Sequence, residues 1–399
     1  MTIPDPGPLV GYLPSDRPCF AFLRGGDGFV AFGEIARLES PTMPQADRWW
    51  SDLIEQIENE TEIPGAFGAG PLAVGSFAFD DATTARPSVF VVPELIIGRR
   101  HGTSWITQIG FDSVSPVLPE LQSPPVPPHS PRIEPGTISP VAWMQRVHDA
   151  VEAIRAGELK KVVLARDLLV QAGAAIDLRG VLARLVHSYG SATAFLVDGF
   201  VGATPEMLVR REGGLVISRV LAGTIPRVDD VNDQQQAARL VASRKDEVEH
   251  QLAVQSVADA LAPLMTGMHV PEAPFVLTLP NVMHLATDVV GVCSPGYSTL
   301  ALAAAVHPTA AACGVPTDAA REYIRTHEGL DRGGFAGPVG WMDAQGDGEW
   351  ALALRCGQLT SDPRRMRLFA GSGLVADSDP HAELVETEAK FEPMRQALS

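Results

Sequence analysis

The sequence contains few cysteines, and they are not clustered. Cys19, Cys293, Cys313 and Cys356 are spread over 399 residues, without a CxxC pair or the spacing of a zinc site. This pattern argues against a disulfide framework and against a cysteine-based metal site. We therefore expect four reduced, mostly buried thiols in a cytoplasmic protein.

Long hydrophobic runs and a basic excess are also missing. No stretch approaches about 18 consecutive apolar residues, so we expect no transmembrane helix. The start of the chain lacks a basic segment followed by an apolar one, so we expect no secretory signal. With 31 basic and 48 acidic residues the net charge is −17, which excludes the electrostatic footprint of a nucleic-acid or anionic-membrane binder.

Apolar side chains are present in sufficient number for a large core, with 45% hydrophobic and 20% charged residues. The length predicts two or three domains, or one large α+β domain. Nine prolines between Pro116 and Pro140 disfavour helix and central strand there. We expect a β-rich N-terminal half at residues 1–115, a proline-rich connector at 116–138 and a larger region at 139–399.

The N-terminal half alternates short apolar runs with glycine turns, which predicts an antiparallel sheet. We expect strands at residues 29–32, 72–79, 89–97 and 105–109, and one helix at 46–58. We find no constellation of catalytic residues in this half.

The region after the connector contains runs of helices and runs of strands. Ser139-Pro140 is an N-cap followed by a helix-starting proline. A long helix is predicted at residues 233–264, with Leu240, Val248 and Leu252 on its apolar face. The other main elements predicted are strands at 161–170, 193–201, 206–211, 214–221, 339–342 and 350–359 and a last helix at 380–398. This order predicts an α+β fold with large antiparallel sheets.

Carboxylates recur at helical spacing on two of these helices. Glu383, Glu386 and Lys390 share one face of the last helix, and Asp246 and Glu249 lie three apart on the long one. Two such stripes could jointly hold Mg²⁺ through oxygen ligands. The commoner alternative is two solvated acidic faces.

Five further residues have chemistry that depends on their surroundings. Arg355 lies in an otherwise apolar stretch, where it would bind a carboxylate or form a buried ion pair. Lys161 begins a strand and is either a general base or an edge residue in water. Glu206 follows a turn and is either a general acid or a surface residue. His284 and His307 are each, taken alone, more typical of structural histidines.

A glycine pair precedes the last acidic helix. Gly371 and Gly373 flank a serine in the stretch 369–373. A Gly-x-Gly turn either presents backbone N–H groups to an anion or is an ordinary tight turn.

In their order along the chain, these segments resemble the chorismate-binding enzymes of the menaquinone, siderophore and tryptophan pathways. The matching strings are KVVLAR (161–166), GATPEML (202–208), AGTIPR (222–227), DEVEH (246–250), NVMHLAT (281–287), HPTAAACG (307–314), DRGGFAGPVGW (331–341), ALRC (353–356) and FAGSGLV with ELVETEAK (369–390). Together they cover essentially all of residues 139–397 and are highly specific as a set. The N-terminal half fits the family only loosely.

The resemblance implies both a fold and a substrate. The family fold is a single large α+β domain of two face-to-face antiparallel sheets with helices packed outside. The substrate, chorismate, carries two carboxylates and a ring hydroxyl. Residues 139–399 would then form the chorismate-binding catalytic region.

Two positions indicate the branch of the family. Ala222 stands where aminodeoxychorismate synthases have a lysine nucleophile. Lys161 stands where the aminating enzymes have glutamine, and lysine there marks the branch that activates water. By resemblance, Lys161 is the general base for water attack at C2, and Glu206 is the general acid toward the leaving C4 hydroxyl.

The resemblance also assigns the rest of the site. The cofactor is Mg²⁺, held by Glu249 and Glu386, with Asp246 and Glu383 close by or bound through water. The substrate-binding residues it implies are Ala222, Gly223, Thr224, His284, Thr309, Arg355, Gly371, Gly373 and Lys390. Among them, Arg355 and the two glycine backbones would hold the enolpyruvyl carboxylate.

The resulting expectation is a Mg²⁺-dependent isochorismate synthase, an isomerase feeding menaquinone or siderophore synthesis in the cytoplasm. The main alternative is a salicylate synthase, which would add pyruvate elimination, although Phe335 replaces a tyrosine common in that group. Further alternatives are anthranilate synthase component I and a catalytically silent chorismate-binding protein. We expect a monomer without nucleic-acid, membrane or glutamine amidotransferase partners.

Overall fold

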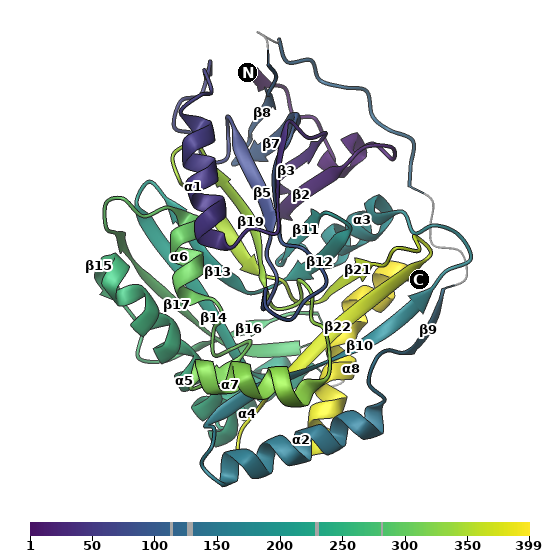
Figure 1. Cartoon of the computed structure of the whole chain (residues 1–399), viewed down its shortest axis with the longest axis vertical. Helices are drawn as coiled ribbons and strands as arrows, with labels where there is room; N and C mark the ends of the chain where they lie inside the picture. Colours follow the sequence, from purple (N-terminus) through teal and green to yellow (C-terminus); the bar gives the residue numbers. More distant parts are fainter. Residues whose placement is uncertain (112–114, 126–130, 228–230, 281) are drawn as a thin grey trace.

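Two antiparallel β-sheets form the frame of the molecule in the computed structural model (Figure 1). The structure describes residues 1–111, 115–125, 131–227, 231–280 and 282–399. Strands from the N-terminal and C-terminal parts of the chain lie side by side in both sheets. The predicted single α+β domain with two large antiparallel sheets is therefore confirmed.

The larger sheet gathers strands from the beginning, middle and end of the chain. Its strands are β1 (Thr2–Ile3), β2 (Cys19–Arg24), β3 (Asp27–Phe32), β7 (Leu95–Arg100), β8 (Thr103–Gln108), β9 (Arg132–Pro135), β10 (Lys161–Gln171), β11 (Thr193–Val197), β12 (Phe200–Thr204), β18 (Gly314–Val315), β21 (Cys356–Leu359) and β22 (Arg365–Leu374). They follow the order β1-β8-β7-β3-β2-β11-β12-β21-β22-β10-β18, with β9 also beside β10.

The smaller sheet has the same mixed origin. Its strands are β4 (Ala36–Glu39), β5 (Leu72–Ser76), β6 (Val89–Val92), β13 (Met207–Glu212), β14 (Leu215–Pro226), β15 (Met265–His269), β16 (Phe275–Thr278), β17 (Val282–Cys293), β19 (Pro338–Asp343) and β20 (Gly348–Leu352). Their order is β15-β17-β14-β13-β20-β19-β5-β6-β4, with β16 paired to β17.

The helices begin where the sequence provides caps. They are α1 (Met43–Ile54), α2 (Pro140–Arg155), α3 (Leu178–Ser188), α4 (Asp233–Val241), α5 (Arg244–Leu261), α6 (Thr299–Val306), α7 (Thr317–Tyr323) and α8 (Pro380–Leu398), with 3₁₀ turns at Leu9–Tyr12 and Ala262–Leu264 and a π-helical turn at Ile324–Glu328. The Ser139 hydroxyl accepts a hydrogen bond from the Ala142 amide at the start of α2, and Asp379 caps α8 in the same way. Both starts were predicted.

The apolar core joins the two sheets, and a second layer covers the larger sheet. Phe29 of β3 meets Trp341 of β19 edge to face, with ring centroids 5.7 Å apart. Leu185 of α3 and Phe391 of α8 belong to a separate cluster with strands of the larger sheet. Burying each such side chain contributes about 1.5–3 kcal/mol. On the smaller sheet, α5 packs against β14 and β17.

Two stretches predicted as single strands pass from one sheet to the other. Residues 89–97 split at Pro93 into β6 and β7, because proline cannot donate to a ladder. Residues 350–359 split into β20 and β21 at Arg355, whose φ is +47°. Both single-strand predictions were wrong, because each apolar run supplies consecutive strands to different sheets.

The predicted long helix at residues 233–264 is also two helices. The Ser243 side chain accepts from the Asp246 amide and starts α5 afresh after α4 ends. Leu240 is buried as predicted, but Val248 is 42% exposed. The buried face of α5 instead carries Asp246 and Glu249, so the predicted apolar face was partly wrong.

The described part of the proline-rich connector is extended. Its strand β9 pairs with the far end of β10, off the main order of the sheet, as expected for a proline-containing strand. Residues 126–130 of the connector lie outside the described residues. Among the described helices, none has the length and apolarity needed to cross a membrane.

Candidate active site

A cavity lies where the chain passes between the two sheets. The links β12–β13 and β20–β21, which change sheet, contribute Glu206 and Arg355. The nine predicted residues that line it are Glu206, Ala222, Thr224, Glu249, His284, Arg355, Gly371, Gly373 and Lys390. The rest of the lining is Val163, Pro205, Leu221, Ala311, Ala312, Phe335, Ala336 and Leu354. Sequence reasoning missed most of this apolar part, because small apolar residues carry no chemical signal of their own.

Lys161 is fully buried at the start of β10, next to this cavity. Its Nζ atom lies 3.1 Å from Oε1 of Glu249 on α5. The interpretation as an edge lysine in water is therefore wrong. Because successive side chains of a strand alternate, Lys161 lies on the same face of β10 as the cavity-lining Val163.

Glu206 is buried in the link between β12 and β13. Removal from water raises the pKa of its carboxyl to about 8, and the charges of Lys161 and Arg355 only partly oppose this. The side chain is therefore protonated at neutral pH and can donate a proton. The alternative of a surface turn residue is wrong.

Arg355 occupies the break between β20 and β21 in a left-handed backbone conformation. Burial lowers the pKa of its guanidinium to about 10, so it stays charged at neutral pH. Its Nη2 atom lies 3.2 Å from Nε2 of His284, whose Nδ1 lies 2.9 Å from the Thr224 hydroxyl. A guanidinium only donates, and burial holds the pKa of His284 well below its usual value, so Nε2 accepts and Nδ1–H donates. The Thr224 hydroxyl proton is then free to point to a ligand.

The two glycines lie within strand β22, where a turn was predicted. A Cβ at Gly373 would stand 2.2 Å from the Glu249 Oε1 atom and 3.2 Å from the Lys161 Cε atom. A side chain at position 373 would therefore force the Glu249 carboxylate to shift from its place beside Lys161. The Gly371 carbonyl accepts from the Lys390 ammonium at 2.9 Å, so this backbone contact ties α8 to β22.

Four carboxylates gather on the facing ends of α5 and α8. Glu249 pairs with Lys161, Glu386 with Lys390 at 2.5 Å, and Glu383 with Lys245 at 2.6 Å. Asp246, Glu249 and Glu383 are buried, so the alternative of solvated acidic faces is wrong. Lys245 was not predicted, although its position one residue before Asp246 places it near the same helix end.

The charges in this cluster act on one another. Burial raises the pKa of Asp246 and of Glu383, and the Glu386 charge raises both further. Burial also acts to raise the pKa of Glu249, but the Lys161, Lys245 and Lys390 charges outweigh it and hold that pKa below its usual value. The lysines therefore offset part of the negative charge of the cluster.

The oxygen donors of the cluster suit Mg²⁺ in chemical kind. Burial is the main cause of the raised pKa values of Asp246 and Glu383, and the neighbouring Glu386 charge adds to it, a repulsion that a cation would relieve. In the part of the chain that the structure describes, no three such side chains converge as a ready set of ligands. The donors therefore fit the ion in chemical kind, and lysines are their counter-charges in this arrangement.

Gly223 and Thr309 lie outside the lining of the cavity. Gly223, at φ +76°, allows β14 to approach α5, because a Cβ there would stand 2.9 Å from the Asp246 Cβ. His250 holds this bulge through Ala222 O at 3.2 Å and Thr287 Oγ1 at 2.7 Å. Thr309 is buried beside Ala311, and its hydroxyl has no partner among the described residues.

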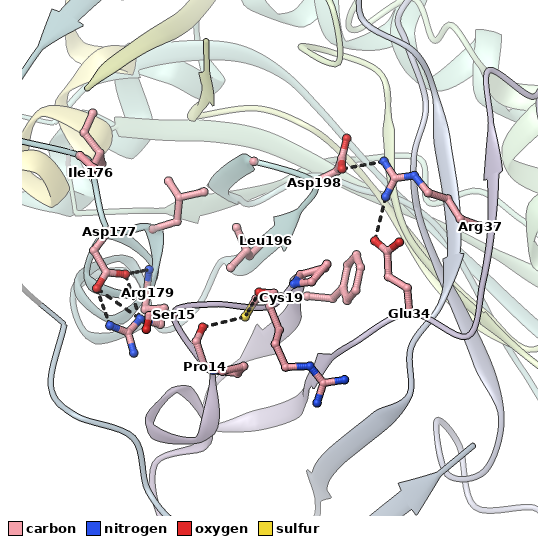
Figure 2. Close-up of a pocket in the computed structure, with 16 residues that line it drawn as sticks. Pro14, Ser15, Cys19, Glu34, Arg37, Ile176, Asp177, Arg179, Leu196 and Asp198 are labelled. Atoms are coloured by element: carbon pink, nitrogen blue, oxygen red, sulfur yellow. Dashed lines mark hydrogen bonds and ion pairs between the residues drawn. The ribbon is translucent and has the colours of Figure 1, made fainter. Parts of the chain in front are cut away.

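A wider hollow of about 680 Å³ lies away from these residues (Figure 2). Figure 2 shows Arg37 between Glu34 and Asp198, and Arg179 against Asp177. Its Cys19 thiol is kept protonated because burial raises the pKa to about 12. Arg17, Arg37 and Arg179, the arginines that line this hollow, are each paired with a carboxylate, so the narrower cavity is the better candidate for catalysis.

Comparison with known proteins shows the family to which the chain belongs. The family model described as "Chorismate binding enzyme" matches residues 24–399. Isochorismate synthase DhbC of Bacillus subtilis is 38% identical over 341 residues, covering 82% of this chain and 81% of the relative. Isochorismate synthase EntC of Escherichia coli K12 is 39% identical over 384 residues, covering 94% and 93%.

The chain also resembles a solved structure over its whole length. The putative 2,3-dihydroxybenzoate-specific isochorismate synthase DhbC of Bacillus anthracis superposes with a TM-score of 0.82 at 33% identity, covering 98% of both chains. The family match extends over the strands and helices that build the cavity, from β3 to α8. The chain belongs to the chorismate-binding enzyme family.

Proposed function

We propose that this protein is an isochorismate synthase, an isomerase that converts chorismate to isochorismate. The observation that carries the proposal is a buried amine and a buried, protonated carboxyl at one cavity, Lys161 and Glu206. The named relatives described above are isochorismate synthases. The pair supplies the two proton transfers that this reaction needs.

The chemistry balances as an isomerisation. The oxygen of water adds to ring carbon C2, the C–O bond at C4 breaks, and the ring double bonds shift. Glu206 donates a proton to the departing hydroxyl, which leaves as water, while Lys161 in its neutral form accepts one from the attacking water. The net effect is transfer of a hydroxyl group from C4 to C2.

Substrate recognition is proposed to rest on the cationic and polar lining. Chorismate carries two carboxylates, and the buried Arg355 guanidinium suits bidentate recognition of one of them. Lys390 supplies a second positive charge. The Thr224 hydroxyl, oriented by His284, is a further donor toward the substrate.

We propose Mg²⁺ as the cofactor, held by Glu249 and Glu386 with Asp246 and Glu383 nearby. When bound, the ion would neutralise carboxylate charge on the protein and on the substrate. The protein's own part is to hold the four carboxylates at the facing ends of α5 and α8 and to provide their lysine counter-charges.

The alternatives differ at residues of the cavity. Phe335 lines it without a hydroxyl, which does not favour salicylate synthase. Ala222 leaves no lysine nucleophile for an aminating enzyme of the anthranilate synthase type. A catalytically silent binding protein would have no need of the Lys161–Glu206 pair.

Incubation with chorismate and Mg²⁺, followed by chromatography, tests the proposal. We expect isochorismate to accumulate, and Lys161→Gln to abolish its formation. Fluorescent salicylate would indicate the salicylate synthase alternative, and anthranilate formed with ammonia would indicate an aminating enzyme. No product at all would overturn the proposal.

We also propose a cytoplasmic monomer that acts without an amidotransferase subunit and supplies menaquinone or siderophore synthesis. Light scattering after size exclusion tests the monomer, and cell fractionation tests the location. The mass of one chain is 42.5 kDa, and a protein species in solution with twice this mass would contradict the monomer.

A further inference from the structure

One edge of β10 has a gap in its strand pairing. On this edge β18 pairs with Lys161 and Val162, and β9 pairs with residues 168–171. Between them, no described strand faces residues 163–167. Buried backbone groups left without partners there would be costly, so other groups must satisfy them.

Side chains fill most of this gap. The Val163 carbonyl accepts from Arg332 Nη2 at 2.6 Å, and the Ala165 amide donates to Glu328 Oε2 at 2.7 Å. The Ala165 carbonyl accepts from Trp143 Nε1 at 3.1 Å, and the Val163 amide donates to a backbone carbonyl at 2.8 Å. A Glu–Arg pair and an indole thus stand where a strand would be.

The Arg332 guanidinium also reaches the neighbouring segment that leads into β18. Its Nη1 donates to the Ala312 carbonyl at 3.0 Å, while Nε and Nη2 donate to Glu328 at 2.7 and 2.6 Å. Val163 and Ala312 both line the cavity. The two segments are also joined by the hydrogen bond from the Val163 amide to the Cys313 carbonyl. Because the guanidinium is planar and rigid, it fixes the two carbonyls relative to each other where the β10–β18 pairing ends.

The pair is itself held firmly. Glu328 is 1% exposed and Arg332 is 4% exposed. Glu328 ends the π-helical turn, a conformation often found near functional sites, and its carbonyl accepts from Arg146 Nη1 at 2.7 Å. Gly329 follows with φ +64° and ends the turn.

We propose that the Glu328–Arg332 pair positions Lys161 and the cavity-lining residues Ala311 and Ala312. This inference rests on the proposed isochorismate synthase function. Val163 lies two residues from Lys161 on the same strand face, so a shift of one carries the other. Small misplacements of a catalytic group cost far more rate than binding. A buried ion pair is often replaceable by apolar residues without loss of stability, and its presence here accords with a positional role.

Arg332→Lys tests this, because lysine keeps the charge and loses the planar fork. We expect kcat, normalised to chorismate-binding sites counted by calorimetry, to fall about tenfold or more. The chorismate Kd should change less than about threefold, since Arg355 and Lys390 are untouched. A matched control is Arg325→Lys, which removes an equally bidentate pair, with Asp80, from the same π-helical turn but on its outer side. The control should keep the wild-type kcat.

Folded Arg332→Lys with the wild-type kcat would overturn the inference, as would equal losses of kcat and of affinity. If Arg332→Lys does not fold, Glu328→Gln repeats the test with the shape retained. In the wild type, the Ala165 amide should be among the slowest to exchange with deuterium, and rapid exchange there would contradict the proposed clamp. A wild type that does not convert chorismate would instead overturn the proposed function, so the two failures are distinguishable.

Discussion

At the scale of single residues, burial decides what each charged group can do. Glu206 and Lys161 have the same formal charges as the many exposed acids and bases of this chain. Removal of Glu206 from water makes it an acid of pKa about 8, whereas exposed glutamates are ionised at neutral pH. The chemistry therefore needs a carboxyl group, and burial between the sheets gives that carboxyl group the pKa of a proton donor at neutral pH.

Glu206→Gln should abolish turnover and leave chorismate binding nearly unchanged, because it removes a proton donor and no positive charge. Product chromatography measures the first effect and calorimetry the second. Loss of affinity equal to the loss of rate would assign Glu206 a structural role.

The raised pKa of Glu206 also predicts a pH dependence. Wild-type kcat should fall above a pH of about 8, where the carboxyl loses its proton. Between its ordinary pKa of 4.5 and about 8, the unfolded chain binds fewer protons at this group than the folded one. The group's contribution to the free energy of unfolding therefore decreases as pH rises.

Thermal melts of wild type and Glu206→Gln from pH 5 to pH 9 check this sign. The Tm of the variant minus the Tm of the wild type should increase as pH rises, because glutamine does not ionise. A constant difference would contradict the raised pKa.

Gly373 leaves room for the Glu249 carboxylate beside Lys161, so Gly373→Ala should displace that carboxylate and reduce kcat by about tenfold or more. The added Cβ would meet Glu249 Oε1 at 2.2 Å. Gly190→Ala is the control, because its Cβ would meet only Val186 O, at 3.8 Å. Steady-state kinetics of both variants measure the effect, and equal kinetics would contradict the proposed crowding.

At the scale of elements, α5 and α8 matter chiefly through the faces they bury. In their N-terminal parts both helices bury carboxylates, with Glu249 beside Lys161 of β10 and Glu383 beside Ser372 of β22, where an ordinary amphipathic helix would bury apolar residues. Buried carboxylates stabilise the fold less than buried apolar side chains would, but they supply the acidic cluster of the candidate active site. It also explains why the apolar periodicity around Val248 misidentified the buried face of α5.

Glu386→Gln should weaken Mg²⁺ binding and reduce the mutual strengthening of Mg²⁺ and chorismate. Because coupling free energies are reciprocal, each ligand should improve the other's affinity by the same factor in the wild type. Calorimetry of each ligand with and without the other measures this. Glu392→Gln is the charge-matched control, because Glu392 lies on the same helix and its carboxylate accepts a hydrogen bond from Gln396 away from the acidic cluster.

Equal chorismate affinity with and without Mg²⁺ in the wild type, together with full activity in excess chelator, would refute the metal proposal. The acidic cluster would then be a structural feature whose charge the lysines partly offset.

The cap of α2 offers a test of stability away from the site. Ser139→Ala removes the side-chain acceptor for the Ala142 amide and should cost about 1 kcal/mol of the free energy of unfolding. Ser139→Asp should retain the cap. Urea unfolding measures both, and kcat should be unchanged in each.

At the scale of the whole molecule, the two parts of the chain are interleaved. β2 pairs with β11 in the larger sheet, and β5 pairs with β19 in the smaller one. Neither part can complete a sheet alone. We expect a single calorimetric unfolding transition, and residues 1–138 expressed alone should remain unfolded by circular dichroism. Two separate transitions would contradict this coupling.

The sequence by itself determined the capped helices α2 and α8, the α+β class and the chemical types of the site residues. Local rules suffice for these, since a cap such as Ser139 depends only on its neighbours. The ordered strings from residue 161 to 390 also indicated the family, and the match over residues 24–399 confirmed it.

Only the tertiary structure decided where the chain passes from one sheet to the other and which charged side chains are buried from solvent. Hydrophobic periodicity contains no information about partners far along the chain. The breaks in the predicted strands at Pro93 and Arg355, and in the predicted helix at Ser243, were therefore missed. The same reason explains why the Glu328–Arg332 pair and Lys245 carried no signal. Their roles arise from contacts with β10 and α8, which the fold brings beside them from distant parts of the chain.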